Sequence, residues 1–244
     1  MKQTTLTVTE NTRLADGIYR LRLAGDTSAI TAPGQFVNLK LSGFFLRRPI
    51  SVCDWSDGEL TLIYKVLGHG TEAMTGMAPG TELDVLTGLG NGYDVSRSGE
   101  HPLLVGGGVG IPPLYGLAKR LTAQGKRVTA VLGFNRKSEI FLAEEFRALG
   151  TEVVIATADG SAGLKGLVTD GMAAVSDYTY LYTCGPEPML KAVYDACKTS
   201  GQFSFEERMG CGFGACMGCS CKTKYGNKRI CKDGPVLEKE EIVW

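Results

Sequence analysis

Short runs in which hydrophobic and polar residues alternate fill the first third of this chain. Between residue 4 and about residue 87, such runs lie at 6–8, 18–23, 36–39 and 60–64, with turn-forming residues between them. A period of two places successive side chains on opposite faces of a β-strand, so these runs predict antiparallel strands. We expect the strands to close into a small barrel.

The pattern changes after residue 87. Residues 88–101 carry turn formers without periodicity, as a linker between domains does. From residue 102 onward, continuous apolar runs alternate with amphipathic stretches. We expect strands near 103–105, 128–132, 153–155, 180–182 and 203–205, and helices that end near 124, 149 and 199. Apolar strands between amphipathic helices predict a parallel, doubly wound sheet.

These two rhythms and a cysteine-rich end divide the chain into three units. Its 244 residues are enough for two ordinary domains. We expect an antiparallel β barrel at residues 1–98, an α/β domain at 99–205 and a C-terminal segment at 206–244. The predicted fold class is therefore a β barrel plus an α/β domain.

Composition narrows the possible functions. Lysine plus arginine and aspartate plus glutamate balance at 26 each, so no net field attracts nucleic acid. No apolar run is long enough to span a bilayer, and we therefore expect no membrane-spanning role. The N-terminus leads directly into a strand pattern without a signal segment, which predicts a cytoplasmic protein. In a reducing cytosol the eight cysteines stay free of disulfides.

A glycine-rich turn joins the first α/β strand to its helix. Residues 106–113 read Gly-Gly-Gly-Val-Gly-Ile-Pro-Pro. Glycines let the backbone approach a pyrophosphate, which the free N–H groups of a helix start then hold. We therefore expect Gly107, Gly108 and Gly110 to bind a dinucleotide. The spacing differs from G-x-G-x-x-G, so a purely structural turn is the alternative.

A second turn of this kind follows a later strand. Cys184, Gly185 and Pro186 come after the run at 180–182 and open the next helix. Two such turns at the carboxyl edge of one parallel sheet would define a ligand crevice. The pair favours a dinucleotide site more than either turn does alone.

Two arginines precede a strand of the predicted barrel. Arg47 and Arg48 stand directly before Pro49, Ile50 and Ser51. A guanidinium fork suits a bidentate phosphate contact, and a strand backbone can hydrogen-bond a flat heterocycle. An ordinary solvated arginine pair is the alternative.

Further along, residues 63–65 and the loop at 68–71 repeat the combination of a strand end, small residues and a hydroxyl. We interpret His69 as a loop residue rather than a catalyst. His101 lies in the linker without a partner that the sequence identifies.

Five of the eight cysteines crowd near the C-terminus. Cys211, Cys216 and Cys219 have the C-x₄-C-x₂-C spacing of plant-type 2Fe-2S proteins, and Cys231 can supply the fourth thiolate. Glycines between them allow the loop to wrap around a cluster with its N–H groups aimed at sulfur. Structural zinc is the alternative metal, although its cysteines usually come in two close pairs. Cys221 stays open as a substitute ligand.

Basic residues surround these cysteines. An ordinary solvated face is one interpretation, and a docking surface for an electron-exchange partner is the other. The residues are Lys222, Lys224, Lys228, Arg229 and Lys232.

The order of the arginine strand, the glycine turn and the Cys-Gly-Pro turn resembles the ferredoxin reductase superfamily. In that superfamily a barrel with an Arg-x-x-Ser strand holds the flavin, and the adjoining sheet holds the nicotinamide. The resemblance implies NAD(H) at the two turns, with the Cys184 turn bringing the nicotinamide over the flavin. It also implies an FAD site made of Arg48, Pro49, Ile50, Ser51, Ile63, Tyr64, Lys65, Gly70 and Thr71.

Nearly the whole chain resembles the electron-transfer subunits of NAD-dependent, type B dihydroorotate dehydrogenases. Residues 46–51, 90–94, 106–115, 207–216 and 231–236 carry this resemblance. It implies an FMN-containing catalytic partner that delivers electrons from dihydroorotate through the 2Fe-2S cluster and FAD to NAD⁺ in pyrimidine synthesis. The expected assembly is a heterotetramer with two copies of each chain. The alternative function is the flavin subunit of a ferredoxin:NADP⁺ oxidoreductase or a hydrogenase-type complex, which shares the same modules.

Overall fold

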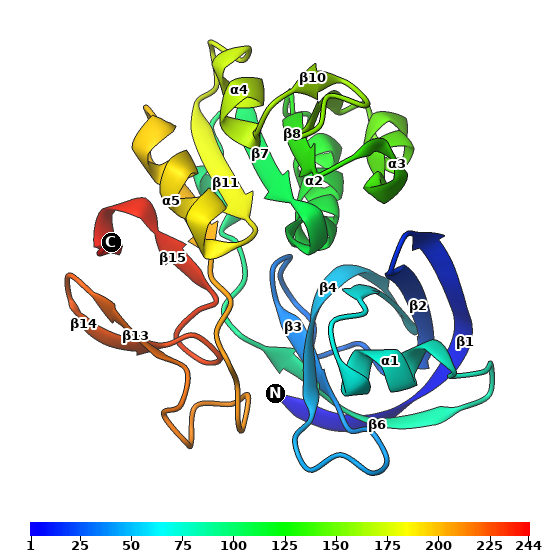
Figure 1. Ribbon diagram of the computed structural model, residues 1–244. Helices are drawn as coiled ribbons and strands as arrows, with labels where there is room; N and C mark the ends of the chain where they lie inside the picture. The colour runs from blue at the N-terminus through cyan, green and yellow to red at the C-terminus, as the bar shows by residue number, and fades with distance from the viewer.

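A closed barrel and a seven-stranded sheet lie side by side in the computed structural model, which describes residues 1–244 (Figure 1). The barrel has the strand order β1-β2-β5-β4-β3-β6, and every pairing in it is antiparallel, as the alternating pattern predicts. The strands are β1 (Lys2–Ala15), β2 (Ile18–Gly25), β3 (Phe36–Leu39), β4 (Arg48–Ser56), β5 (Glu59–Lys65) and β6 (Glu82–Leu89).

Alternation fills the barrel with apolar side chains. Along β6, Leu83, Val85 and Thr87 are buried, and Asp84 and Leu86 between them are less covered. Leu83 and Val85 meet the apolar faces of the other strands, and the removal of such side chains from water is the main force that closes the barrel.

A short helix, α1 (His69–Thr75), lies where a loop was expected, so the interpretation of His69 as a loop residue is wrong. Met74 is fully buried in the barrel and fixes the helix to it. The Asn11 side chain holds the same, C-terminal end of the helix by donating to the carbonyl oxygens of Met74 at 2.8 Å and Met77 at 3.2 Å. These contacts reach far along the chain, which is why the local pattern did not reveal them.

The sheet has the order β10-β9-β8-β7-β11-β12-β15. Its first six strands are parallel, as predicted, but β15 comes from the C-terminal segment and pairs antiparallel with β12. The strands are β7 (Pro102–Gly107), β8 (Thr129–Phe134), β9 (Glu152–Thr157), β10 (Leu164–Lys165), β11 (Tyr180–Cys184), β12 (Gly201–Ser204) and β15 (Val236–Glu238).

Helices cover both faces of the sheet, which makes it doubly wound (Figure 1). Helices α2 (Ile111–Ala123) and α3 (Ala143–Ala148) pack on one face, and α4 (Val168–Ala173) and α5 (Glu187–Ala196) pack on the other. The prediction that α5 runs to residue 199 is wrong.

Helix α5 ends at Ala196, and a lysine of the C-terminal segment binds the backbone that follows. Cys197 is extended, and its carbonyl oxygen accepts a 2.6 Å hydrogen bond from the Lys239 ammonium. The same ammonium also donates to the Thr199 carbonyl oxygen at 3.2 Å.

The barrel and the sheet meet where α2 packs against β4. Lys119 on the helix forms a 2.7 Å ion pair with Asp54, and the Arg120 guanidinium lies 4.3 Å from the centroid of the Trp55 ring. This interface holds the carboxyl ends of the strands, where the glycine turn follows β7, against the barrel.

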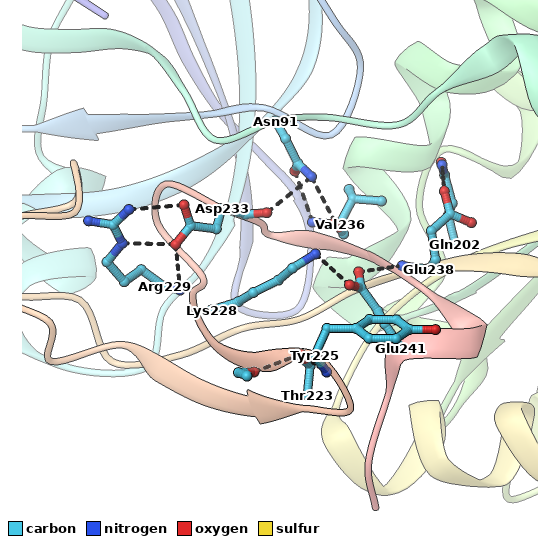
Figure 2. A network of polar contacts seen from close by, with 11 residues as sticks. Asn91, Gln202, Thr223, Tyr225, Lys228, Arg229, Asp233, Val236, Glu238 and Glu241 are labelled. Atoms are coloured by element: carbon cyan, nitrogen blue, oxygen red, sulfur yellow. Dashed lines mark hydrogen bonds and ion pairs between the residues drawn. The ribbon is translucent and has the colours of Figure 1, made fainter.

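The C-terminal segment is tied to both units (Figure 2). It contains the hairpin β13 (Ser220–Thr223) and β14 (Gly226–Arg229) as well as β15. Asn91, which follows the barrel, donates its side-chain amide to the carbonyl oxygen of Val236 at 2.7 Å, and its side-chain oxygen accepts from Val236 N–H at 3.1 Å. Gln202 of β12 donates to Glu238 at 2.7 Å.

Candidate functional site

The two predicted turns meet at one point of the sheet. Strands β7 and β11 are neighbours, but the chain continues from β7 toward β8 and from β11 toward β12, so the strand order reverses between them. Ligands of open α/β sheets bind in the crevice at such a reversal. Added to Gly110, a Cβ would lie 2.2 Å from the Cys184 carbonyl oxygen, so only glycine allows the turns to touch.

A cavity of about 920 Å³ runs from this point to the barrel. Of the fifteen cofactor-binding residues that the sequence proposes, only Gly70 does not line it. A Cβ on Gly70 would lie 2.1 Å from the Nε atom of Arg48, so this glycine allows Arg48 to lie against α1. The cavity is lined by Arg48, Pro49, Ile50, Ser51, Ile63, Tyr64, Lys65, Thr71, Gly107, Gly108, Gly110, Cys184, Gly185 and Pro186.

The two adjacent arginines have different environments. The Arg47 guanidinium donates to the Asp84 carboxylate and the Asp84 carbonyl oxygen, both at 2.9 Å. Arg48 bonds only the Leu46 carbonyl oxygen, at 2.6 Å, and it lines the cavity. Arg47 therefore ties the start of β4 to β6, and Arg48 is available to a ligand phosphate.

An aromatic stack borders the barrel end of the cavity. The rings of Tyr19 and Tyr64 lie 5.7 Å apart and nearly parallel. The Tyr64 hydroxyl donates to the Asn11 side-chain oxygen at 3.2 Å, and burial raises the pKa of this tyrosine to about 12. Tyr64 is thus neutral at physiological pH.

Cys184 is a wall residue rather than a nucleophile. Burial raises the pKa of its thiol to about 12, so the reactive thiolate is scarce at neutral pH. Thr183, the residue before Cys184, is held by Tyr93, because its carbonyl oxygen accepts a 3.0 Å hydrogen bond from the Tyr93 hydroxyl.

The sequence did not identify several wall residues. Phe36 borders the barrel side of the cavity, and Met209 and Pro235 bring the C-terminal segment into the same wall. Asp16 and Glu139 line it as well. Met209 and Pro235 lie in stretches that carry the family resemblance, but no motif assigned a role in the cavity to any of these five residues.

The four predicted cluster cysteines lie as two pairs. The Cys211 sulfur accepts N–H groups from Ala215 at 3.2 Å and Cys216 at 3.4 Å, and the Cys219 sulfur accepts the Cys231 N–H at 3.4 Å. No group of three or more potential ligands is arranged to hold one metal ion. Two pairs suit a binuclear cluster, since each iron takes two thiolates.

Backbone donors favour the thiolate at the start of this loop. Burial acts to raise the pKa of Cys211, but the N–H groups of Cys216, Phe213 and Ala215, together with the Cys216 thiol, lower it to about 6. Burial and the adjacent Cys219 raise the pKa of Cys231 to about 12. A cluster would hold both sulfurs as thiolates, because a coordinating metal ion displaces the proton.

Cys221, which the sequence left open as a substitute ligand, is a half-buried residue of β13. Burial and, to a smaller extent, the Glu207 carboxylate raise the pKa of its thiol.

The cysteine loop lies directly against the barrel. A Cβ on Gly212 would come within 2.4 Å of the Asn38 amide nitrogen, which itself donates to the Cys211 carbonyl oxygen at 3.4 Å. Asn38 is 1% exposed, and its side-chain oxygen has no hydrogen-bond partner. The close approach places the cluster loop next to the flavin side of the molecule.

The basic residues around the cysteines are partly neutralised. Lys228 pairs with Glu241, and Arg229 forms a 2.8 Å ion pair with Asp233 (Figure 2). Lys224 donates to the Glu240 carbonyl oxygen at 2.8 Å. These three residues hold the segment together, and only Lys222 and Lys232 are exposed without such a bond.

His101, which had no predicted partner, is buried and does not line the cavity. Its Nε2 atom lies 2.9 Å from the Thr129 hydroxyl, and its Nδ1 atom lies 2.8 Å from the Arg127 guanidinium. The same Nδ1 atom lies 3.0 Å from the Asp177 carbonyl oxygen, so His101 ties β8 to the loop before β11.

A flavin-type barrel, a nicotinamide-type sheet and a four-cysteine loop, joined around one cavity, define an iron-sulfur flavoprotein oxidoreductase with a ferredoxin reductase fold. The comparisons with known proteins agree. Residues 206–243 match the model of the iron-sulfur cluster binding domain of dihydroorotate dehydrogenase B, and residues 104–195 match the oxidoreductase NAD-binding domain.

Curated relatives match along their whole length. The electron transfer subunit of dihydroorotate dehydrogenase B (NAD⁺) from Geobacillus sp. (strain WCH70) is 46% identical over 257 residues, covering 100% of this chain and 99% of the relative. The same subunit from Fusobacterium nucleatum is 43% identical, with 99% of each chain covered. The chain belongs to the family of dihydroorotate dehydrogenase B electron transfer subunits.

Solved structures share the fold. An NADH-dependent reduced ferredoxin-NADP oxidoreductase superposes with a TM-score of 0.89 at 30% identity, covering 98% of this chain and 90% of the other. A ferredoxin NADP⁺ reductase from Neisseria gonorrhoeae has a TM-score of 0.70 at 17% identity, covering 80% of this chain and 90% of the other. Proteins with the alternative function therefore share this fold. The relatives with higher sequence identity to this chain are dihydroorotate dehydrogenase B electron transfer subunits.

None of the helices combines the length and the hydropathy needed to cross a bilayer.

Proposed function

We propose that this chain passes electrons from a dihydroorotate-oxidising, FMN-containing catalytic subunit to NAD⁺. The observation that carries the proposal is the single cavity that joins β4 and β5 of the barrel to both turns of the sheet, with the C-terminal segment in its wall. When bound, a flavin exchanges hydride with nicotinamide and single electrons with an iron-sulfur cluster.

The residues divide the cavity into two sides. Arg48 would hold an FAD phosphate, and the backbone of residues 49–51 and 63–65 would bind the flavin ring. Thr71 would lie beside the phosphates, and Gly70 would leave room for the Arg48 side chain. Gly107, Gly108 and Gly110 would hold the NAD(H) pyrophosphate. The turn of Cys184, Gly185 and Pro186 would orient the nicotinamide. The glycine cradle supports this division, since a Cβ on Gly108 would meet no protein atom within 4 Å and would project into open space.

We assign the cluster to Cys211, Cys216, Cys219 and Cys231. The two cysteine pairs and the N–H groups directed at their sulfurs support the assignment. Residues 1–98, 99–205 and 206–244 would act as the FAD, NAD and cluster units. The third unit lends β15 to the sheet, which fixes the cluster loop in place.

The catalytic partner would contact the cluster loop. Cys216 is exposed, and so are the nearby apolar side chains of Phe213, at 42%, and Met217, at 54%. We propose a heterotetramer with two copies of each chain, in the cytoplasm, where eight free cysteines would stay reduced.

Co-expression with the FMN-containing subunit tests the proposal. The purified complex should reduce NAD⁺ when dihydroorotate is added, and its mass should equal two copies of each chain. The matched control is the complex carrying Cys216→Ser, which should oxidise dihydroorotate with an artificial acceptor but produce no NADH. An intact complex that contains iron, FMN and FAD and yet forms no NADH from dihydroorotate would refute the proposed function.

A further inference from the structure

A charged group lies in the cavity wall beyond the glycine turn. The Arg136 side chain forms a 3.1 Å ion pair with Glu139 and a 3.7 Å ion pair with Asp16. All three residues line the cavity. Glu139 is held further by Asn135, whose side-chain amide donates to its second oxygen at 2.9 Å.

This group joins the two halves of the molecule. Asp16 lies in the turn between β1 and β2 of the barrel, and Arg136 follows β8 of the sheet. The backbone N–H of Asp16 also points at the Ser138 carbonyl oxygen, at 3.5 Å. The barrel therefore contributes a carboxylate to a part of the cavity that the sheet otherwise forms.

The position of β8 indicates which part of a dinucleotide would come here. If the nicotinamide lies at the Cys184 turn after β11 and the pyrophosphate at the turn after β7, the adenosine half extends toward β8, on the opposite side of β7. This step rests on the proposed function. It places the adenosine ribose within reach of Asp16, Arg136 and Glu139.

The charges favour a ribose hydroxyl over a phosphate. The wall carries two carboxylates and one guanidinium at this end, and the guanidinium is already paired with both. Arg13 pairs with Asp16 from outside the cavity wall, and Asp159 lies near Arg136. Carboxylates accept hydrogen bonds from a ribose diol, whereas a 2′-phosphate brings about two further negative charges.

We propose that Glu139 and Asp16 make this chain select NAD over NADP, because they neutralise Arg136 and present acceptor oxygens to the 2′-hydroxyl. Arg136 alone would suggest an NADP site, but its two ion pairs make it part of an NAD site. Asp16 comes from the flavin barrel and Glu139 from the sheet domain, so the selectivity for NAD over NADP depends on the contact between the two domains.

The test is calorimetric titration of the oxidised, FAD-loaded protein with NAD⁺ and NADP⁺, and with 5′-AMP and 2′,5′-ADP as probes of the ribose site. The wild type should prefer the ligand without the 2′-phosphate in each pair. In Asp16→Asn/Glu139→Gln the preference should fall at least about tenfold, mainly through tighter binding of NADP⁺ and 2′,5′-ADP. Glu139→Gln alone should give a smaller change of the same sign, and it carries the test if the double variant does not fold.

Glu144→Gln is the matched control, since it removes one negative charge from an exposed carboxylate of α3 that pairs with Arg147. Its ligand preference should equal that of the wild type. Retained NAD⁺ binding with an unchanged preference in the folded variants would overturn this inference and leave the proposed function standing. A protein that holds FAD but binds none of the four nucleotides would overturn both.

Discussion

The carbonyl oxygen of Cys53 in β4 lies 2.7 Å from the point that a Cβ on Gly116 of α2 would occupy. The helix can therefore approach the barrel this closely only because residue 116 lacks a side chain. Since α2 begins at the glycine turn, the contact also sets the distance between that turn and the flavin strands. It is a structural feature that neither domain explains alone.

Gly116→Ala should destabilise the protein by about 1–3 kcal/mol, because the added methyl group must push α2 away from β4. Denaturant unfolding measures the change. Gly76→Ala is the control, since its Cβ would make an ordinary 3.8 Å contact, and it should change stability by less than about 0.5 kcal/mol. Equal stability of the two variants would show that the interface is loose.

Cys216→Ser should remove the visible absorbance of the cluster and most of the iron, while Cys221→Ser should retain about two irons per chain. The reason is that Cys216 lies in the predicted ligand spacing next to Cys211, whereas Cys221 is a half-buried residue of β13. Iron and acid-labile sulfide analysis of anaerobically purified protein measures both. Equal iron loss in the two variants would contradict the ligand assignment.

The adjacent arginines should give opposite phenotypes. Arg48→Ala should weaken FAD binding at least about tenfold with little loss of stability, because one charge-assisted hydrogen bond to a phosphate is worth about 1.5–3 kcal/mol. Arg47→Ala should instead lower the melting temperature by several degrees, because it leaves Asp84 without its 2.9 Å partner. Flavin retention on gel filtration and thermal melts separate the two. A stable Arg48→Ala protein that retains a full complement of bound FAD would count against the phosphate contact.

Gly108→Val should weaken NAD⁺ binding while FAD stays bound. Gly108 has a φ of 52°, and its missing Cβ would project into open space, where the proposed pyrophosphate lies. Gly125→Val controls for backbone strain, because Gly125 has a φ of 77°, is equally open and lies outside the cavity wall. Both variants should lose similar stability, about 1–2 kcal/mol. If NAD⁺ affinity falls equally in both, the glycine turn is only structural.

The sequence by itself determined the parts of this protein that short-range patterns encode. Alternating polarity predicted β1, β2, β3 and β5 of the barrel but named no run at β6, the glycine turns marked the carboxyl ends of β7 and β11, and the cysteine spacing pointed to the cluster. Each of these features depends on residues that are close in the sequence. Arg47 and Arg48 show the limit of such patterns. Their chemistry is the same and only the family resemblance singled out Arg48, whereas the approach of Asp84 from β6 gives the physical reason why Arg47 is structural.

Tertiary structure decided what had to be brought together from distant positions. Examples are the contact of Gly110 with Cys184, the addition of β15 to the sheet and the pairing of Asp16 with Arg136. Each of these depends on how two packed units dock. Docking is set by the shape and burial of many side chains at once, and no local period records it.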